Sequence, residues 1–220
     1  MFEALWVTAK LAAVTTVWLL LLGTPLAWWL ARTQNRLSPF IEALVALPLV
    51  LPPTVLGFYL LIAFAPQSTI GQVWEAVTGQ RLAFSFSALV IGSVLYSLPF
   101  VVQPLQAAFR QLPDALLEAA ASLGATPGDR ARHLVWPLCR PSFIAAASLG
   151  FAHTVGEFGV VLMIGGNIPG ETQVLSIALY DRVESLDLGT AHALALALML
   201  FSLVTLILLY RQSHRWAVRP

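Results

Sequence analysis

The chain has 220 residues, of which 58% are hydrophobic and only 10% are charged. Soluble domains carry roughly 25% charged residues, so this composition excludes an ordinary water-soluble domain and predicts a membrane protein. The net charge of +1 indicates no nucleic-acid partner, and the single cysteine, Cys139, excludes both an internal disulfide and a cysteine-based metal cluster.

Five apolar stretches are long enough to cross a bilayer, which takes roughly 20 mostly apolar residues in a helix. They comprise residues 11–31, 41–65, 84–109, 143–164 and 191–210. The first continues through Trp28 and Trp29 without a small-residue cleavage pattern, so it is interpreted as a span and not as a signal peptide. A sixth span would need Gln67–Val77, which is short and polar and is expected to be an external surface helix. The sequence therefore predicts an all-α polytopic membrane protein with five transmembrane helices, or six as the alternative, in a single domain covering residues 1–220.

Basic residues indicate the orientation, because they concentrate in cytoplasmic loops. With five spans, nine of the twelve basic residues fall on one side, in the first connection, the third connection and the tail: Arg32, Arg36, Arg110, Arg130, Arg132, Arg140, Arg211, Arg215 and Arg219. The other side carries more acidic than basic residues. The distribution predicts that the N-terminus lies outside, the C-terminus lies in the cytoplasm and residues 111–140 form a cytoplasmic loop.

Three prolines, Pro48, Pro52 and Pro53, interrupt the second span. Proline removes a backbone donor and kinks or breaks a helix. Broken helices at membrane depth persist only where protein or a water-filled cavity satisfies the freed backbone groups. Two interpretations stay open, a kinked packing helix and an element that lines or gates a pathway; in the second, Pro52, Pro53 and Thr54 are the candidate residues.

The loop at 111–140 is expected to form two short helices around a turn. Pro113 suits the start of the first helix, with Asp114 near its positive end, and Gly124 suits the chain reversal that follows. The small residues of Ala119–Ala121 permit close approach by another surface. The pair is interpreted either as a docking element for a cytosolic partner or as a loop that packs on its own bundle.

The second helix of the loop carries a clear start signal. Thr126 has the position of a capping residue, with Pro127 at the first helical position and Asp129 at capping-box spacing. Two further prolines, Pro137 and Pro141, are expected to end this helix and set off the fourth span.

One carboxylate, Glu157, falls within the fourth span, in the stretch Gly156-Glu157-Phe158-Gly159. A charge inside the membrane costs about 3 kcal/mol or more, which makes it a functional candidate. His153 lies four residues earlier on the same helical face and is the expected partner. The alternatives are a structural pair that locks helices together and a gate that involves Gly156 and Glu157. No lysine or arginine lies centrally in any span, so we expect a conduit of weak affinity with selectivity held elsewhere.

The loop resembles a known motif. Glu118-Ala119-Ala120, three residues, Gly124, nine residues, Leu134, one residue and Trp136-Pro137 are similar to the EAA loop of binding-protein-dependent ABC importer permeases. The family has isoleucine at the position of Leu134 and leucine at that of Trp136, which is the departure. The resemblance implies a type I ABC importer permease fold whose loop forms coupling helices seated on the ATPase. The implied coupling residues are Glu118, Ala119, Ala120, Gly124, Thr126 and Pro127.

The same resemblance implies the partners. They are a cytosolic ATPase dimer, a periplasmic substrate-binding protein, membrane lipid and, because only one EAA copy is present, a second copy of the permease. Transport would proceed by alternating access in the bacterial inner membrane, and no cofactor is implied.

Three stretches look like the molybdate permease subunits of this family, namely residues 51–57, 154–159 and 166–173. Sulfate, thiosulfate and tungstate permeases share parts of the first two and are the alternatives. The third stretch lies in an expected external loop, where a binding protein would dock. Its candidate contact residues are Asn167, Pro169, Gly170 and Glu171; the alternative is a solvated face.

Two other classes are weighed against a transporter subunit. An intramembrane enzyme is disfavoured, since the sequence has no His-Glu-x-x-His pattern, no Gly-x-Ser-x-Gly elbow and no carboxylate pair within a span. A stand-alone secondary transporter is disfavoured because the spans show no internal repeat. The chain also lacks a phosphate-binding loop, so ATP hydrolysis must come from another subunit.

Overall fold

The computed structural model describes residues 2–217, without the side chains of residues 209, 210 and 212–217. The described chain is a series of helices joined by short turns. In order they are α1 (Phe2–Arg32), α2 (Ser38–Val50), α3 (Pro53–Phe64), α4 (Thr69–Thr78), α5 (Phe86–Arg110), α6 (Asp114–Ser122), α7 (Pro127–Arg130), the π-helical turn η1 (Ala131–Val135), α8 (Trp136–Gly156), α9 (Gly159–Gly165), α10 (Leu175–Glu184) and α11 (Leu188–Ala217). Arg219 lies outside the described residues.

Four helical segments are long and apolar enough to cross a membrane: α1, α5, the run Pro127–Gly156 and the part of α11 up to Leu208. The pair α2 and α3 makes a fifth span if it is counted as one, although its two halves bend by 112°. The prediction of an all-α membrane protein with about five spans is therefore confirmed. The stretch proposed for a sixth span forms α4, whose 10 residues are too few to cross a bilayer.

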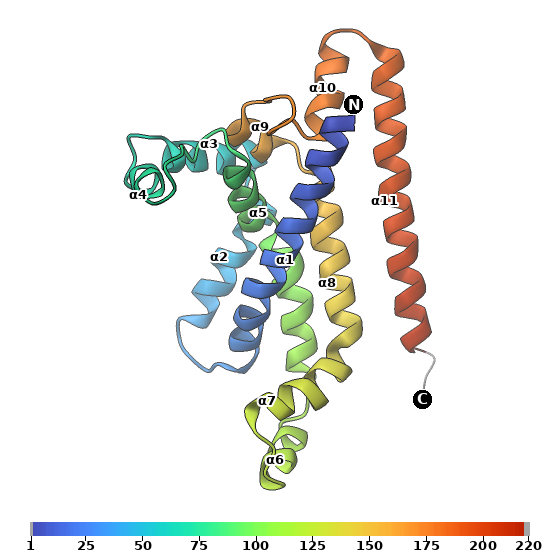
Figure 1. The fold of residues 1–220 in the computed structure, drawn as a ribbon. Coiled ribbons are helices and arrows are strands. Elements are labelled where there is room, and N and C mark those ends of the chain that lie inside the picture. The colour runs from blue at the N-terminus through green and yellow to red at the C-terminus, as the bar shows by residue number, and fades with distance from the viewer. Residues whose placement is uncertain (1, 218–220) are drawn as a thin grey trace.

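The centre of the bundle is formed by α1, α5 and α8, which pack side by side (Figure 1). Their contacts bury large apolar side chains such as Leu19, Leu105 and Phe109 almost completely. Around this centre, α2 packs on α5, α3 packs on α9, and α11 packs on α8 and α10. Many side chains of α11 remain exposed, including Met199 and Leu203, as expected for a helix that faces lipid or another subunit.

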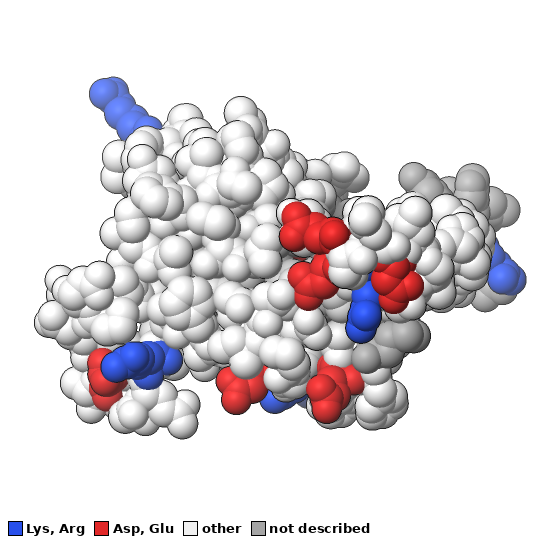
Figure 2. Space-filling model, turned by 90° about the horizontal axis from the view of Figure 1, so that it is seen from above, with Lys and Arg blue, Asp and Glu red and all other residues white. Residues whose placement is uncertain are grey.

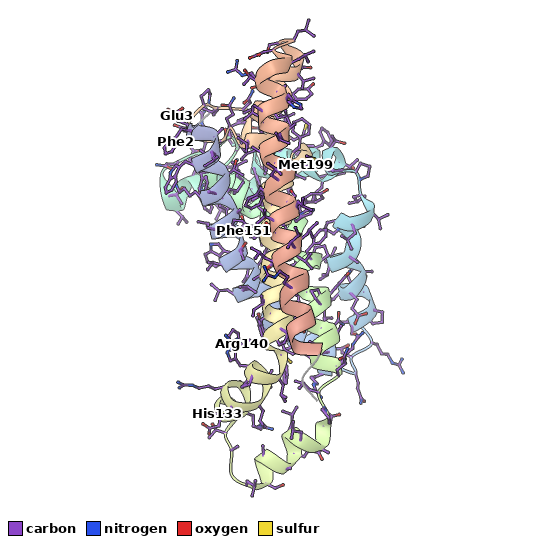
Figure 3. All side chains as sticks on the ribbon, turned by 90° about the vertical axis from the view of Figure 1, so that its right-hand side faces the viewer. Phe2, Glu3, His133, Arg140, Phe151 and Met199 are labelled. Carbon is purple, nitrogen blue, oxygen red and sulfur yellow. The ribbon has the colours of Figure 1, made fainter. Side chains whose placement is uncertain are left out.

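The bundle has two distinct ends. The helix pair α6 and α7 protrudes at one end, below the spans in Figure 1, and α11 runs down toward this same end. The N-terminus and α10 lie at the opposite end. Figure 3 shows the same division, with His133 and Arg140 near the first end and Glu3 at the other. We call these the α6–α7 end and the α10 end.

The helix after α7 differs from the expectation, because the prediction that Pro137 and Pro141 end it was wrong. Helical structure continues from Pro127 to Gly156, with the wide turn η1 inserted just before Pro137. In this turn the N–H of Trp136 bonds to the carbonyl of Ala131, five residues back. Such a π-turn widens the helix where a proline disrupts the usual bonds, so the chain passes the prolines without breaking.

Candidate functional site

The helix pair at the α6–α7 end has the turn geometry that the sequence predicts. α6 begins at Asp114 directly after Pro113, and it ends where Gly124 adopts a left-handed φ of +85°. The N–H of Gly124 bonds to the carbonyl of Ala121 at 2.9 Å, and the N–H of Ala125 bonds to that of Ala120 at 3.0 Å. Glycine adopts this conformation without the steric cost of a Cβ, which explains its place at the reversal.

A capping box holds the start of α7. Thr126 Oγ1 accepts a hydrogen bond from the N–H of Asp129 at 3.2 Å, and Asp129 Oδ2 accepts from the N–H of Thr126 at 3.0 Å. Asp129 Oδ2 also accepts from the Thr126 hydroxyl at 2.6 Å. These bonds, led by that from the hydroxyl, lower the pKa of the Asp129 carboxyl. The predicted cap is confirmed, and it makes the pair a defined structure at the membrane surface.

The outer surface of the pair is exposed and partly apolar. No residue of α6 is fully buried, and Glu118 and Ala119 are exposed. Leu123 at the tip is 89% exposed, far more than a leucine that packs on its own bundle would be. An exposed leucine beside small alanines is typical of a surface that another protein covers.

Arg32 connects this helix pair to the bundle. In the sequence this residue indicates only the orientation of the chain in the membrane. Arg32, at the end of α1, forms a salt bridge with Asp114 at the start of α6. Its second terminal nitrogen donates to the carbonyls of Phe109 and Leu112, each at 3.0 Å. Its guanidinium also lies 5.2 Å from the ring of Trp28. One side chain thus joins α1 to the corner between α5 and α6.

A second polar link joins α2 to α5 at the same end. Glu42 accepts hydrogen bonds from Gln106 at 2.7 Å and from Arg110 at 2.5 Å. The sequence does not predict this link, because Glu42 lies more than 60 residues from both partners. Only the opposite charges of Glu42 and Arg110 indicate that they could pair.

Two helix breaks meet near the α10 end. α2 and α3 are separated at Leu51 and Pro52, and the fourth predicted span breaks between α8 and α9 at Glu157 and Phe158. The two breaks are neighbours, because a Cβ built on Gly159 would lie only 2.8 Å from Cβ of Pro53. The structure therefore brings the predicted proline segment and the predicted carboxylate segment together, although about 100 residues separate them in the sequence.

The surfaces of these segments differ. Pro52, Thr54 and Gly156 are exposed, whereas Pro53 is half-buried and the side chain of Glu157 is buried. Broken helices within a membrane persist where protein or a water-filled cavity satisfies the backbone groups that the break frees, which makes these exposed residues candidates to line such a cavity.

The predicted pairing of Glu157 with His153 was wrong. His153 Nδ1 lies 2.8 Å from Ser97 Oγ instead, and its ring stacks on Phe100 with centroids 4.1 Å apart. The reason is that α8 ends at Gly156, so Glu157 has extended backbone angles and leaves the helical face that carries His153.

The carboxyl group of Glu157 is buried, and neither of its oxygens forms a hydrogen bond of good geometry among the described residues. The hydroxyl of Ser93, which is also buried and otherwise unpaired, is close enough to act as a weak donor to it. The backbone carbonyl of Glu157, by contrast, accepts a bond from Ser176 Oγ at 2.5 Å. A buried polar group without partners is costly, and it persists where another state or another molecule supplies the partner.

The loop before α10 divides the predicted contact residues into two kinds. Asn167 is half-buried, and its side-chain amide donates to both carboxylate oxygens of Asp181, at 3.1 and 2.9 Å. Pro169, Gly170 and Glu171 are exposed. Asn167 therefore supports the loop from within, and the other three form its outer surface.

The α10 end carries mainly acidic side chains. Figure 2 looks down on this end and shows Asp and Glu gathered over part of a largely uncharged face. Four carboxylates belong to the loop before α10, to α10 itself and to the turn after it: Glu171, Asp181, Glu184 and Asp187. This end thus contrasts with the arginine-rich α6–α7 end, in agreement with the charge asymmetry of the sequence.

Comparisons with known proteins agree with this geometry. The chain matches the family described as "binding-protein-dependent transport system inner membrane component" over residues 23–218. It is 56% identical over 207 residues to the molybdenum transport system permease protein ModB of Azotobacter vinelandii, covering 94% of this chain and 92% of that protein. It is 32% identical over 198 residues to the sulfate transport system permease protein CysT of Synechocystis sp., covering 90% of this chain and 68% of that protein.

A solved structure shares the fold. It is the crystal structure of a bacterial ABC transporter involved in the import of the acidic polysaccharide alginate, with a TM-score of 0.72. The superposition covers 99% of this chain and 80% of that chain at 16% sequence identity, so this likeness concerns the fold alone.

Proposed function

Because the chain belongs to the family of binding-protein-dependent transport system inner membrane components, we propose that it is the membrane-spanning subunit of an ATP-driven importer for molybdate. The observation that carries this proposal is the protruding, capped helix pair α6 and α7, with its exposed Leu123 and alanines. A rigid pair of this kind can enter a groove of a cytosolic ATPase and transmit its movement.

The route of that movement starts at Asp114. Closure of the ATPase dimer would displace α6. The bonds of Arg32 with Asp114, with the carbonyl of Phe109 in α5 and with that of Leu112 in the turn would carry the displacement into α1 and α5 together. The covalent connections of the pair lead only to α5 and, through α7 and η1, to α8, so Arg32 is what adds α1. We propose Glu118, Ala119, Ala120, Gly124, Thr126 and Pro127 as the coupling residues.

The pathway requires a second subunit. Since one chain carries a single coupling pair, two copies of the permease on an ATPase dimer are the simplest assembly. The broken segments around Pro53 and Glu157, with exposed Pro52, Thr54 and Gly156, are the proposed pathway or gate. The described spans offer no central lysine or arginine to hold an oxyanion tightly, which suits a conduit that receives its substrate from a binding protein.

The orientation follows from the same assignment. We propose that the α6–α7 end faces the cytoplasm, that the N-terminus lies outside, and that the exposed loop residues Pro169, Gly170 and Glu171 contact the periplasmic binding protein. The arginines around α6 and α7 and the carboxylates at the α10 end support this direction.

Sulfate is the second candidate substrate, because a sulfate permease is among the relatives. Molybdate is favoured by the higher identity to the molybdenum permease. The test is uptake into proteoliposomes that contain the permease, its ATPase and its cognate binding protein. Radiolabelled molybdate should accumulate with ATP and resist competition by a hundredfold excess of sulfate. Equal uptake of sulfate would overturn the substrate assignment, and ATP-independent uptake would overturn the ABC assignment.

A further inference from the structure

A large apolar cavity lies between α1 and α8, next to the helix pair α6 and α7. Its volume is about 930 Å³, and residues such as Leu21, Phe109, Phe143 and Ile144 line it, with Arg130 at one end. This volume is in the range of ligand-binding sites. The cavity is open at its side, because the lining residues Leu21 and Trp136 are 60% and 52% exposed.

The polarity of the cavity changes along the bundle axis. Its deep part is formed by the spans, at Leu21 on α1 and Ile144 on α8, where the surroundings are hydrocarbon. Trp28 lies two turns further along α1, about 10 Å closer to the α6–α7 end. Tryptophan at such a level is typical of the membrane interface. The cavity thus begins in the hydrocarbon and ends at Arg130 near the water, which matches the shape of an amphiphile.

The end of the cavity is cationic. Nε of Arg130 is buried and has no hydrogen-bond partner among the described residues. Nε of Arg32 is likewise buried without a partner, and the guanidinium of Arg32 lies over Trp28, which lines the cavity.

The neighbouring carboxylate of Asp129 is already engaged with Thr126. The carboxylate of Asp114 pairs with a terminal nitrogen of Arg32 and leaves its Nε free in the described chain. An anion at this end would therefore find two unused Nε donors.

The charge balance of the whole α6–α7 end argues against a protein segment of a second copy as the occupant. In the described chain this end has four acidic residues: Glu42, Asp114, Glu118 and Asp129. Glu42 accepts from Arg110, Asp114 from Arg32 and Asp129 from Thr126. Arg32 and Arg110 are thus already paired, and only Glu118 is left to meet the other five arginines of the described chain at this end: Arg36, Arg130, Arg132, Arg140 and Arg211. The surplus of cations calls for an anion from outside the chain.

We propose that this cavity binds an anionic phospholipid of the phosphatidylglycerol type, with its phosphate at Arg130 and an acyl chain along Leu21, Phe143 and Ile144. Membrane surfaces that carry anionic lipids attract such arginines. Leu117 of α6 and Pro127 of α7 also line the cavity, so the bound lipid would touch the coupling pair and the spans at once. This site is independent of which oxyanion the importer carries.

The test uses the purified permease–ATPase complex and lipids with brominated acyl chains, which quench nearby tryptophans. In nanodiscs, brominated phosphatidylglycerol is expected to quench the fluorescence contributed by Trp28 and Trp136 more than brominated phosphatidylcholine does. Replacement of each by phenylalanine identifies its contribution. Arg130→Gln is expected to reduce the preference for phosphatidylglycerol about fivefold, the contribution of one basic residue near an anionic surface.

Two variants serve as controls. Arg132→Gln removes an exposed arginine that does not line the cavity, and it is expected to change the preference less than twofold. Ala147→Phe fills the deep part and keeps the charge, so it should reduce quenching by both lipids. If Arg130→Gln fails to fold, Arg130→Lys and Ala147→Phe still decide the matter. Equal quenching by the two lipids, an equal effect of Arg130→Gln and Arg132→Gln, or protection of both tryptophans by a second permease copy would overturn the proposal.

Discussion

Arg32, the last residue of α1, is bonded to Asp114, the first residue of α6, across 82 positions of sequence. The two ends of this link differ in exposure, since the side chain of Arg32 is 21% exposed and that of Asp114 is 78% exposed. Arg32 also donates to the carbonyls of Phe109 and Leu112. It is therefore an anchoring side chain that binds the corner between α5 and α6 by several groups, and the salt bridge is only one of them.

The difference in exposure predicts unequal effects of the two partners. Arg32→Gln is expected to lower the free energy of unfolding by about 2 kcal/mol, because it removes charged hydrogen bonds to two partly buried carbonyls. Asp114→Asn, the matched control, is expected to cost less than about 1 kcal/mol, since an exposed ion pair contributes little. Denaturant unfolding of the purified permease in detergent measures both. Equal losses would mean that the ion pair alone holds the corner.

The capping box predicts an acid-sensitive α7. The pKa of Asp129 lies below its ordinary value near 3.8, because the carboxylate accepts bonds from Thr126. A depressed folded pKa means that the carboxylate stabilises α7 at pH above 3.8 and that this contribution is lost as the pH falls through the lower folded value. Amide hydrogen exchange at Asp129 and Arg130, corrected for the intrinsic rate, measures this. Protection should be constant near neutral pH and should decrease when the pH is lowered below 3.8.

The control for this prediction is Thr126→Ala. It removes the hydroxyl that bonds to Asp129, so protection of α7 should be lower already at neutral pH and should change less with acid. The same acid response in both proteins would show that another group is titrating.

The contact between the two helix breaks predicts a contrast between neighbouring glycines. Gly159→Ala would place a Cβ 2.8 Å from Cβ of Pro53, whose ring cannot rotate away, so α3 and α9 must separate. The expected cost is about 1–3 kcal/mol, as for other overpacked sites. Gly156→Ala meets no atom within 4 Å and is expected to be tolerated. Thermal unfolding of the two variants, compared at equal detergent concentration, checks the contrast, and a Gly156→Ala variant that is the less stable one would contradict it.

The buried carboxyl of Glu157 predicts a separation of transport from stability. Glu157→Gln keeps the size of the side chain and an oxygen that can accept from the nearby Ser93 hydroxyl, so the permease should assemble and unfold as the unaltered protein does. If Glu157 finds its partner in another state of the transport cycle, binding-protein-dependent uptake should fall at least tenfold. A variant that fails to assemble would instead assign Glu157 to packing.

The sequence predicts well those features that depend on short-range signals. Span lengths follow from runs of apolar residues, and the start of α7 follows from Thr126, Pro127 and Asp129, which lie within one helical turn. The left-handed turn at Gly124 likewise needs only a glycine at the end of a helix. These features form the α6–α7 pair, which is why its geometry could be predicted from the sequence.

Features that depend on contacts between distant segments could not be predicted. α8 ends at Gly156 without a proline, and the turn that follows packs against Pro53, which lies about 100 residues away in the sequence. Conversely, Pro137 predicts the end of a helix, because proline lacks the backbone N–H that would bond to the preceding turn. The π-helical turn η1 before it lets the helix continue without that bond. The partners of Arg32 are equally remote in sequence. Local propensity does not contain this information.

The central claim is that α6 and α7 form a cytosolic lever driven by an ATPase, and labelling at Leu123 tests it most directly. Leu123 is 89% exposed at the tip of the pair, and Cys139, the only native thiol, is buried, so Leu123→Cys provides a single accessible thiol. A membrane-impermeant maleimide should label it in inside-out vesicles and not in intact cells, and bound ATPase should block the reaction. Labelling from the outer face of intact cells, or labelling that the ATPase does not affect, would contradict the account.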